Sequence, residues 1–458
     1  MVTAEGPTPS MLPSSKAEPG GIAELWTLAY PVMVATLSQS MMGVVDTFYM
    51  GRVGTAEQGA VGLSMITFWT ITSLFVGTVH GVATFAAQHF GARNFHLCGR
   101  DGWMGLYFSV PAALLLAGIA CLSEPIFVLL GQDDSIVPHA SAYISVRLYG
   151  AFAVLVNYTM VSFLRGIGDT KTPMYFAFGA NVLNIIINYP LILGHWGCPA
   201  MGAFGAALGS VIATAIFSVA YLIFFLTGER HRRYQTRFIP YPRFKEMVSF
   251  LKIGLPIGGN WTLEMISWTA FMIIISRFGA VALAATEIVF EILHFSFLGA
   301  IALGHAATTL VGQYLGADHP GTAQKTAKST ILSSILYCVS MGVLFFTCRK
   351  LIVSWFSLDQ AVIDVGARLF IYAAIFQFFD GLGISCTSVI RGAGDTRWPM
   401  LLMAIVAWGF FIPLTFVLTQ WADMGIDGAW IAATLFIVTV SMGVYARYRS
   451  GRWISMRV

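Results

Sequence analysis

Charged residues are scarce in this chain, making up 10% of its 458 residues against roughly 25% in an ordinary soluble domain. This composition excludes a soluble globular protein, because a polar surface could not be built from it. Cysteine is scarce too: the six residues are scattered and form no CxxC pair, so we expect neither a disulfide framework nor a zinc site. The sequence also lacks a Walker A motif, an HExxH motif and a Ser-His-Asp arrangement. We therefore expect no ATP hydrolysis within this chain, no enzyme active site and no bound cofactor.

Long runs of apolar residues are the main feature of the sequence. Hydrophobic residues make up 57% of the sequence, and the mean hydropathy is +0.74. Stretches of about 20 apolar residues, enough to span a bilayer as a helix, recur along the chain. This pattern predicts an all-α, multi-pass protein embedded in the lipid bilayer. The twelve expected spans are 25–50, 58–82, 103–123, 137–163, 172–194, 201–227, 247–276, 281–308, 330–348, 362–389, 398–419 and 427–447.

The sequence contains an internal repeat. RGIGDTKTPM (165–174) and RGAGDTRWPM (391–400) are near copies 226 residues apart, and Pro31 matches Pro256 at an offset of 225. Self-similarity on this scale indicates two homologous halves. Six spans per half is an even number, so both halves enter the membrane from the same side. We therefore expect two parallel repeats, each a six-helix bundle.

Positive charge predicts the orientation. With both termini in the cytoplasm, 20 of the 26 Lys and Arg residues fall on the cytoplasmic side, as the positive-inside rule requires. The other six, Arg147 among them, lie outside or near the outer ends of helices. The net charge of +4 thus reports topology in a cell membrane, such as a bacterial inner membrane, and not nucleic-acid binding. The expected domains are a disordered cytoplasmic N-terminus (1–23), an N-lobe with helices 1–6 (24–228), a basic cytoplasmic linker (229–246), a C-lobe with helices 7–12 (247–448) and a cytoplasmic tail (449–458).

Turn and cap chemistry explains the duplicated GxGDT motif. Its Gly residues permit a positive φ, its Asp and Thr can cap the following helix, and Pro173 or Pro399 falls in the first turn of that helix. We expect the motif to shape the fold and not to contact a substrate.

The two halves differ in the acidic residues inside their expected spans. Asp46 stands where the second half has Phe271, and Glu264 stands where the first half has Gln39. An ionised carboxylate near the bilayer centre costs about 2.5–3.5 kcal/mol, so such a residue faces a cavity or a partner. The spans that carry these acids contain almost no Lys or Arg. We therefore predict a functional role for the acids Asp46, Glu264, Asp380, Glu287 and Glu291.

Helical spacing aligns other polar groups with these acids. Carboxylate and amide oxygens are ligands for a hard cation such as Na+, and a carboxylate alone can carry a proton. The same stripes could instead hold helices together, and both interpretations remain open. The stripes are Asn181, Asn184 and Asn188 in the fifth span, Asn260, Glu264 and Ser267 in the seventh, Glu287, Glu291 and His294 in the eighth, and Gln377 with Asp380 in the tenth.

A family resemblance accompanies these features. The segment AYPVMVATLSQSMMGVVDTFYMGRVG (29–54), the Gln-x-x-Gly-Ala turns and the duplicated RGxGDT resemble the MATE family, the multidrug and toxic compound extrusion transporters, over residues 24–447. The separated acids resemble its NorM-type subgroup. The resemblance implies a V-shaped cleft between two bundles that alternates its opening. It also implies exchange of inward-moving Na+ or H+ for amphipathic, often cationic, organic compounds. A two-lobed cleft needs no partner chain, so we expect a monomer.

The resemblance further implies two ion-sensitive regions. Asp46 matches an acid on the family's first helix, and Glu264 and Asp380 match acids on its seventh and tenth. A hydroxyl expected on the sixth helix falls at Gly209 or Ser210. Many NorM-like sequences have a His-Gln pair on the eighth helix, where this chain has Thr286 and Glu287. The expected ion-coupling residues are Glu264, Asp380, Glu287, Glu291, Asn260 and Gln377 in the C-lobe, and Asp46, Asn181, Asn184, Asn188 and Ser210 in the N-lobe.

Aromatic residues near the acids could stack on planar cations, although each could instead serve as packing or face lipid. The expected cleft residues are Gln39, Trp261, Trp268, Phe290 and Phe379. The alternative function is a flippase or a narrow-specificity exporter of the same wider superfamily. A flippase for a lipid-linked pyrophosphate would need a basic cleft, whereas the intramembrane charge here is acidic. A channel is a further alternative, but nothing in the chain resembles a filter loop.

Overall fold

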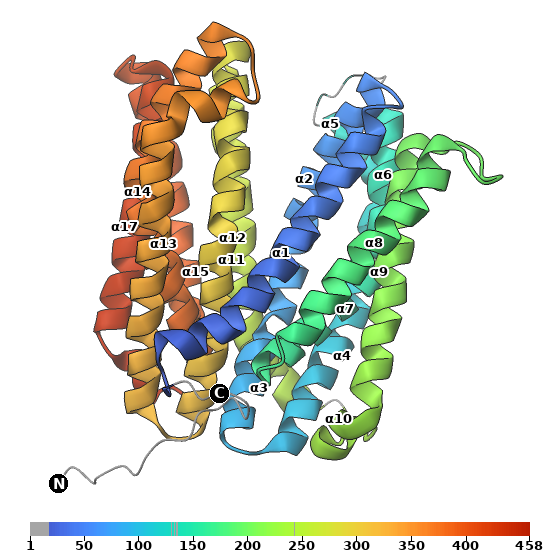
Figure 1. Cartoon of the computed structure of the whole chain (residues 1–458), viewed down its shortest axis with the longest axis vertical. Coiled ribbons are helices and arrows are strands. Elements are labelled where there is room, and N and C mark those ends of the chain that lie inside the picture. Colours follow the sequence, from blue (N-terminus) through green and yellow to red (C-terminus); the bar gives the residue numbers. More distant parts are fainter. Residues whose placement is uncertain (1–17, 130, 132, 134–135, 242) are drawn as a thin grey trace. The chain divides into compact units, whose positions relative to one another are not determined.

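A computed structural model describes residues 18–129, 131, 133, 136–241 and 243–458, and these residues form helices and connecting turns without a strand. The chain divides into two compact units (Figure 1). We call Val34–Gly258 the N-unit, and Gly259–Val458 together with the residues up to Met33 the C-unit. Residues 1–17, most of the N-terminal segment expected to be disordered, lie outside the described part of the chain.

The N-unit contains the helices of the first half. Its α8 and α9 pack together, and α4, α3 and α9 pack on α7. The N-unit helices are α1 (Ile22–Met50) from Val34 onward, α2 (Thr55–Val79), α3 (Gly81–Gly91), α4 (Phe95–Ala120), α5 (Ser123–Leu129), α6 (Val137–Tyr149), α7 (Ala151–Gly166), α8 (Lys171–Leu193), α9 (Gly202–Leu226), α10 (Gly228–Tyr234) and the first part of α11 (Phe244–Ser276).

The C-unit contains the helices of the second half. Its α14 packs on α12, α13 and α17, and its core gathers large apolar side chains such as Trp430 and Phe271, which are fully buried. The C-unit helices are the rest of α11, α12 (Ala280–Gly316), α13 (Pro320–Ser354), α14 (Gln360–Gly392), α15 (Arg397–Val406), the π-helix η1 (Ala407–Phe411), α16 (Ile412–Phe416), the π-helix η2 (Val417–Trp421), α17 (Gly425–Arg449) and the 3-10 helix η3 (Arg452–Ser455).

The predicted fold of two six-helix repeats is confirmed. Among the described residues ten helical segments are long and apolar enough to cross a membrane, and α6 with α7, bent by 51°, makes an eleventh. The 33-residue α11, which carries Glu264, completes the twelve. The protein therefore passes the membrane many times. Several helices run beyond their expected ends. For example, α12 continues to Gly316, eight residues past the end of the expected span 281–308.

Each unit includes the first part of a helix whose larger part lies in the other unit: the C-unit includes the start of α1, and the N-unit includes the start of α11. In the C-unit, Leu25 and Leu28 of α1 are buried in a cluster with Leu310, and Tyr314 Oη donates to the Glu24 carboxylate at 2.8 and 2.9 Å. The boundaries after Met33 and after Gly258 are 225 residues apart, which is the repeat offset. The two helices are therefore divided at equivalent points.

Glycine permits the corresponding contact in the N-unit. A Cβ added to Gly77 would lie 2.5 Å from the Cα of Gly258, and one added to Gly81 would lie 3.1 Å from the Cα of Gly254. The start of α11 thus crosses α2 and α3 with backbone against backbone, which a larger side chain would prevent. Pro256, one of the two repeat-related prolines, lies inside α11 at this crossing.

The GxGDT turns serve the structural role expected of them. Asp169 accepts hydrogen bonds from the Thr172 amide (3.1 Å) and hydroxyl (2.8 Å), and so caps α8. Its Oδ2 also pairs with Arg230 at 2.7 Å. In the second copy Asp395 pairs with Arg447 at 2.7 Å, so an arginine near the end of each half holds the turn. The cap prediction is confirmed for the first copy, and both copies form an ion pair that the motif alone did not predict.

Candidate functional site

The first candidate site is a closed hydrogen-bond cluster around Asp46 in the N-unit. Asp46 lies one turn before the end of α1, and only 2% of it is exposed. Asn188 Nδ2 donates to Asp46 Oδ1 at 2.6 Å, and Ser210 Oγ donates to Asp46 Oδ2 at 3.0 Å. Asn184 Nδ2 donates to Ser210 Oγ at 3.1 Å. Both carboxylate oxygens therefore have donors, and three helices, α1, α8 and α9, meet at this carboxylate.

Helix periodicity and one glycine build this cluster. Asn184 and Asn188 are one turn apart on α8, and Asn188 Nδ2 also donates to Asn184 Oδ1 at 3.2 Å. A Cβ on Gly209 would overlap Asn188 Oδ1, so glycine leaves room for that amide on the facing helix α9. Asn181 lies one turn before Asn184 on α8 and donates to the Ser38 carbonyl at 2.9 Å instead. The stripe predicted on the fifth span therefore contributes two residues to the cluster and one to helix packing.

The structure adds an arginine to the Asp46 cluster. Arg147 of α6 is 9% exposed, and its guanidinium carbon lies 4.6 Å from the centroid of the Phe68 ring. Its charge interacts electrostatically with Asp46 and with the fully buried Tyr143. That Arg147 lies outside or near an outer helix end stays a prediction, and the structure adds that its side chain is buried among helices.

The second candidate site is a pair of acids in the C-unit. Glu264 of α11 and Asp380 of α14 are half-buried, and their like charges interact electrostatically. Arg391, the arginine of the second RGxGDT copy, lies near enough to Glu264 to attract it. Two carboxylates and one guanidinium thus share this region, and their formal charges sum to −1.

A carboxylate oxygen without a donor among the described residues distinguishes the C-unit site. Asp380 Oδ2 is buried and has no hydrogen-bond partner in the described part of the chain, and the same holds for Gln377 Oε1 one turn earlier. Gln377 Nε2 donates to Ser296 Oγ at 2.9 Å, which fixes the amide. An acceptor buried without a donor is costly, and a proton or a metal cation would satisfy it. Asn260, also predicted for this site, is buried at 8% exposure one turn before Glu264.

The acids on α12 have a different environment. Glu287 and Glu291 are exposed, as is His294 on the same stripe, whereas Thr286 beside them is fully buried. No ion pair joins either glutamate to another described residue. The structure does not bring them into the Glu264–Asp380 pair through any described contact.

Two of the expected cleft aromatics pack against other rings of the C-unit. Trp268 meets Phe271, Phe290 and two further rings edge to face, with centroids 5.3–5.9 Å apart. Phe290 also stacks on Phe271 at 5.8 Å. Trp268 and Phe290 are both partly buried and pack against the C-unit core, and their place in a cleft stays a prediction. Of the other three, Trp261 and Phe379 are half-buried and Gln39 is exposed.

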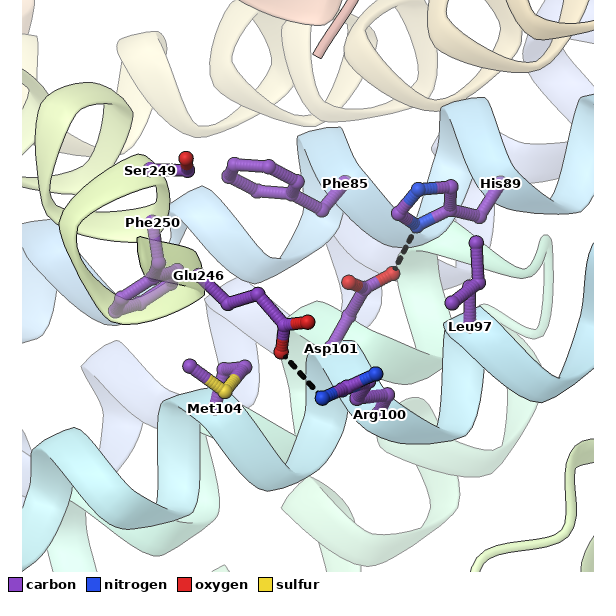
Figure 2. A pocket seen from close by; sticks show the side chains of 9 residues that line it. All are labelled: Phe85, His89, Leu97, Arg100, Asp101, Met104, Glu246, Ser249 and Phe250. Atoms are coloured by element: carbon purple, nitrogen blue, oxygen red, sulfur yellow. Dashed lines mark hydrogen bonds and ion pairs between the residues drawn. The ribbon is translucent and has the colours of Figure 1, made fainter. Parts of the chain in front are cut away.

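The N-unit also contains a pocket of about 230 Å³ that shares no residue with the Asp46 cluster. Figure 2 shows two ion pairs beside it: His89 with Asp101, and Arg100 with Glu246, each at 2.7 Å. Phe85 and Phe250 line the apolar part. The opposite charges of Arg100 and Glu246 neutralise each other in the pocket wall, and this ion pair ties α4 to the first turn of α11. We interpret this pocket as part of the attachment of α11 to the N-unit.

Among the described residues, no group of three or more His, Cys, Asp or Glu side chains is arranged to hold a metal ion. Sequence reasoning missed Arg147 and Arg391 as members of the two sites. The only sequence signal for them was that each is an arginine within or at the end of an apolar stretch, 137–163 or 362–389.

Comparison with known proteins places these sites in context. The MatE family model matches residues 31–190 and 256–417, one match in each half. The Multidrug resistance protein NorM of Burkholderia vietnamiensis is 29% identical over 423 residues, covering 91% of each chain. The Multidrug resistance protein PmpM of Pseudomonas aeruginosa is 28% identical over 416 residues, covering 89% of this chain and 87% of its own.

Solved structures share the fold. The eukaryotic MATE transporter AtDTX14 superposes with a TM-score of 0.85 at 18% identity, covering 94% of this chain and 96% of its own. A MOP superfamily transporter from Pyrococcus furiosus superposes with the same TM-score at 17% identity, covering 94% and 95%. The binding pocket of that transporter has a reverse polarity, which suggests a different function for it.

Proposed function

Because this chain belongs to the MatE family, we propose that it is a multidrug efflux transporter, and not an enzyme, that exchanges inward-moving Na+ or H+ for amphipathic organic cations. The names of its relatives support multidrug resistance as the physiological setting. The acids of the C-unit support cation coupling. We further propose a bacterial inner membrane as the location, with both termini cytoplasmic, on the distribution of Lys and Arg.

The observation that carries the proposal is Asp380 beside Glu264. Two carboxylates in electrostatic reach of one another disfavour the state in which both are ionised. Arg391 offsets one of the two charges, and Asp380 Oδ2 still lacks a donor among the described residues. A single proton or Na+ would complete both the charge balance and the hydrogen bonding. An organic cation would satisfy the charge in the same way, so ion and drug would compete for this site.

Competition is sufficient for antiport. Suppose that the ion and the drug bind the same acids. The ion, driven by its inward gradient, then displaces the drug at the outer side of the membrane, and the drug displaces the ion at the inner side. The two units are candidates for the moving bodies, since their boundaries fall inside α1 and α11 close to Pro31 and Pro256. Proline removes a backbone hydrogen bond and so lowers the cost of bending a helix there.

A lipid flippase is less well supported. A pyrophosphate headgroup needs basic residues without a compensating acid, but the arginines at the two candidate sites each interact electrostatically with a carboxylate: Arg147 with Asp46, and Arg391 with Glu264. The reverse polarity of the Pyrococcus furiosus pocket belongs to that protein, whereas acids prevail at the C-unit site here.

The experiment that tests the proposal is ethidium efflux from proteoliposomes that contain the purified protein, driven in turn by an inward Na+ gradient and an inward proton gradient. We expect efflux with one of the two gradients, which identifies the coupling ion. Efflux with neither gradient, in protein that is folded by its thermal unfolding curve, would contradict multidrug antiport and favour a narrow-specificity exporter.

A further inference from the structure

We propose that Arg147 is the resident counter-cation of Asp46, so that the N-unit cluster excludes a coupling cation for as long as this arginine is in place. The proposal deepens the proposed function, because it states which of the two acidic sites is closed to the ion. It begins from the burial of a charge. Arg147 is 9% exposed, inside an expected span, 137–163, that contains no other Lys or Arg.

Arginine is always charged in a protein, and its guanidinium carries five donors. Arg147 Nε is buried without a hydrogen-bond partner among the described residues, and Arg147 forms none of the ion pairs found within that part of the chain. Its cation–π contact with Phe68 offsets only part of the cost of burial. The compensating negative charge is Asp46, with which it interacts electrostatically.

Packing keeps the two charges together. Tyr143 is one turn before Arg147 on α6, and Met50 is one turn after Asp46 on α1; both are fully buried in the same apolar cluster. The Tyr143 hydroxyl is buried without a partner in the described part of the chain, on the same side of α6 as Arg147 by helical spacing. α6 therefore brings a cation and a hydroxyl within electrostatic reach of a carboxylate that already accepts from Asn188 and Ser210.

This arrangement explains how the Asp46 cluster can contain suitable ligands for Na+ and still not bind it. Asp46 and the amide oxygen of Asn188, which has no donor among the described residues, are suitable ligands for Na+. A second cation beside the guanidinium would meet its repulsion, and the desolvated carboxylate is already compensated. Removal of the arginine charge should therefore convert the cluster into a Na+ site.

Thermal unfolding of the purified full-length protein tests this inference. The midpoint is measured in NaCl and in choline chloride at equal ionic strength, for the wild type, Arg147→Gln, Asp46→Asn and the double variant. We expect the rise in midpoint caused by Na+ to be larger in Arg147→Gln than in the wild type by about 2 °C, as for Na+ at about 30 times the dissociation constant of the new site. The additional rise should disappear in the double variant, while any contribution from the C-unit acids cancels in the comparison.

Arg165→Gln is the matched control. Arg165 is 5% exposed in the same unit, but its electrostatic partners are Tyr158 and Tyr221. Its loss should lower the midpoint without enlarging the response to Na+. An unchanged response to Na+ in Arg147→Gln, with midpoint losses that add to those of Asp46→Asn, would show that Arg147 only packs on Phe68 and would overturn the proposal.

The design allows for a variant that does not fold. If Arg147→Gln fails to fold, recovery of folding in the double variant Asp46→Asn/Arg147→Gln supports the charge pair, since neither charge is then left alone. Failure of the double variant as well contradicts it. Thermal unfolding requires no gradient, so an absence of efflux leaves this inference standing, and an unchanged response to Na+ leaves the efflux proposal standing.

Discussion

In the N-unit, both oxygens of the buried carboxylate Asp46 accept hydrogen bonds, and a buried arginine compensates its charge. In the C-unit, Asp380 Oδ2 accepts none from a described residue, and a second carboxylate lies nearby. The repeat positions are reciprocal: the counterpart of Asp46 is Phe271, in the aromatic core of the C-unit, and the counterpart of Asp380 is the buried Val154. One repeated fold thus carries a satisfied acid in one unit and an unsatisfied acid in the other.

The difference shows how duplication separates structural and chemical roles. Positions that both halves keep, such as the GxGDT turns, form the ends of helices. Positions that differ carry the charge. A satisfied, compensated acid gains little by binding an ion, whereas an unsatisfied acid beside a like charge gains both a partner and relief from repulsion.

The largest expected effect comes from removal of the unsatisfied acid. Asp380→Asn keeps the side-chain volume, removes one of two like charges and should leave the protein at least as stable. We expect it to lower ion-driven ethidium efflux by about 5- to 150-fold, the range typical of coupling between two sites. The measurement is the initial efflux rate in proteoliposomes under the gradient that drives the wild type.

Asp364→Asn is the control for this variant. Asp364 is exposed on the same helix α14, where it pairs weakly with Lys350 at 3.8 Å. Its efflux rate should match the wild type. An Asp380→Asn protein that transports as fast as Asp364→Asn would remove the basis for a coupling role at this site, and with it the contrast between the units.

Much of this contrast could be predicted from the sequence. The repeat offset led to the two bundles, and the acids absent from the other half led to Asp46, Glu264 and Asp380. The helical spacing of Asn184 and Asn188 placed them on one face, and the structure brings both to Asp46. These features are local or periodic, so a single sequence displays them.

The partners of the acids could not be predicted, because they come from other helices. Arg147 is 101 positions from Asp46, and Arg391 is 127 positions from Glu264. Only the packing of α6 and α14 brings them within electrostatic reach of these acids. The division of α1 and α11 between the units was also beyond the sequence, since an uninterrupted helix does not reveal which unit each of its ends packs against.

A smaller effect is expected from a substitution of Gly209, the glycine that leaves room for the Asn188 amide. In the second half Ala432 stands at the position of Gly209, and no hydrogen-bonded acid cluster forms there among the described residues. Gly209→Ala would put a methyl group against Asn188 Oδ1 and displace this amide from Asp46. We expect a loss of about 1–3 kcal/mol in stability, the usual cost of overpacking, seen as a lower midpoint of thermal unfolding.

Gly62→Ala serves as the comparison for this variant. Gly62 is also helical, in α2 of the same unit, and a Cβ there meets nothing within 4 Å. Alanine at such a position should be neutral or stabilising by up to about 1 kcal/mol. If the two variants unfold at the same temperature, Gly209 is not needed for the hydrogen bond between Asn188 and Asp46.

The smallest effect is expected at the exposed acids of α12. Glu287 and Glu291 are exposed and have no ion-pair partner among the described residues. Each should therefore contribute less than about 1 kcal/mol to the binding free energy of a cationic substrate. Glu287→Gln combined with Glu291→Gln should change the efflux of a cationic substrate by about twofold, and should leave a neutral substrate and the coupling ion unchanged. Efflux of ethidium compared with a neutral dye, under each gradient, measures this. A switch of the coupling ion in the double variant would mean that α12 belongs to the coupling site, and the C-unit acids would then have to be treated as one group of four.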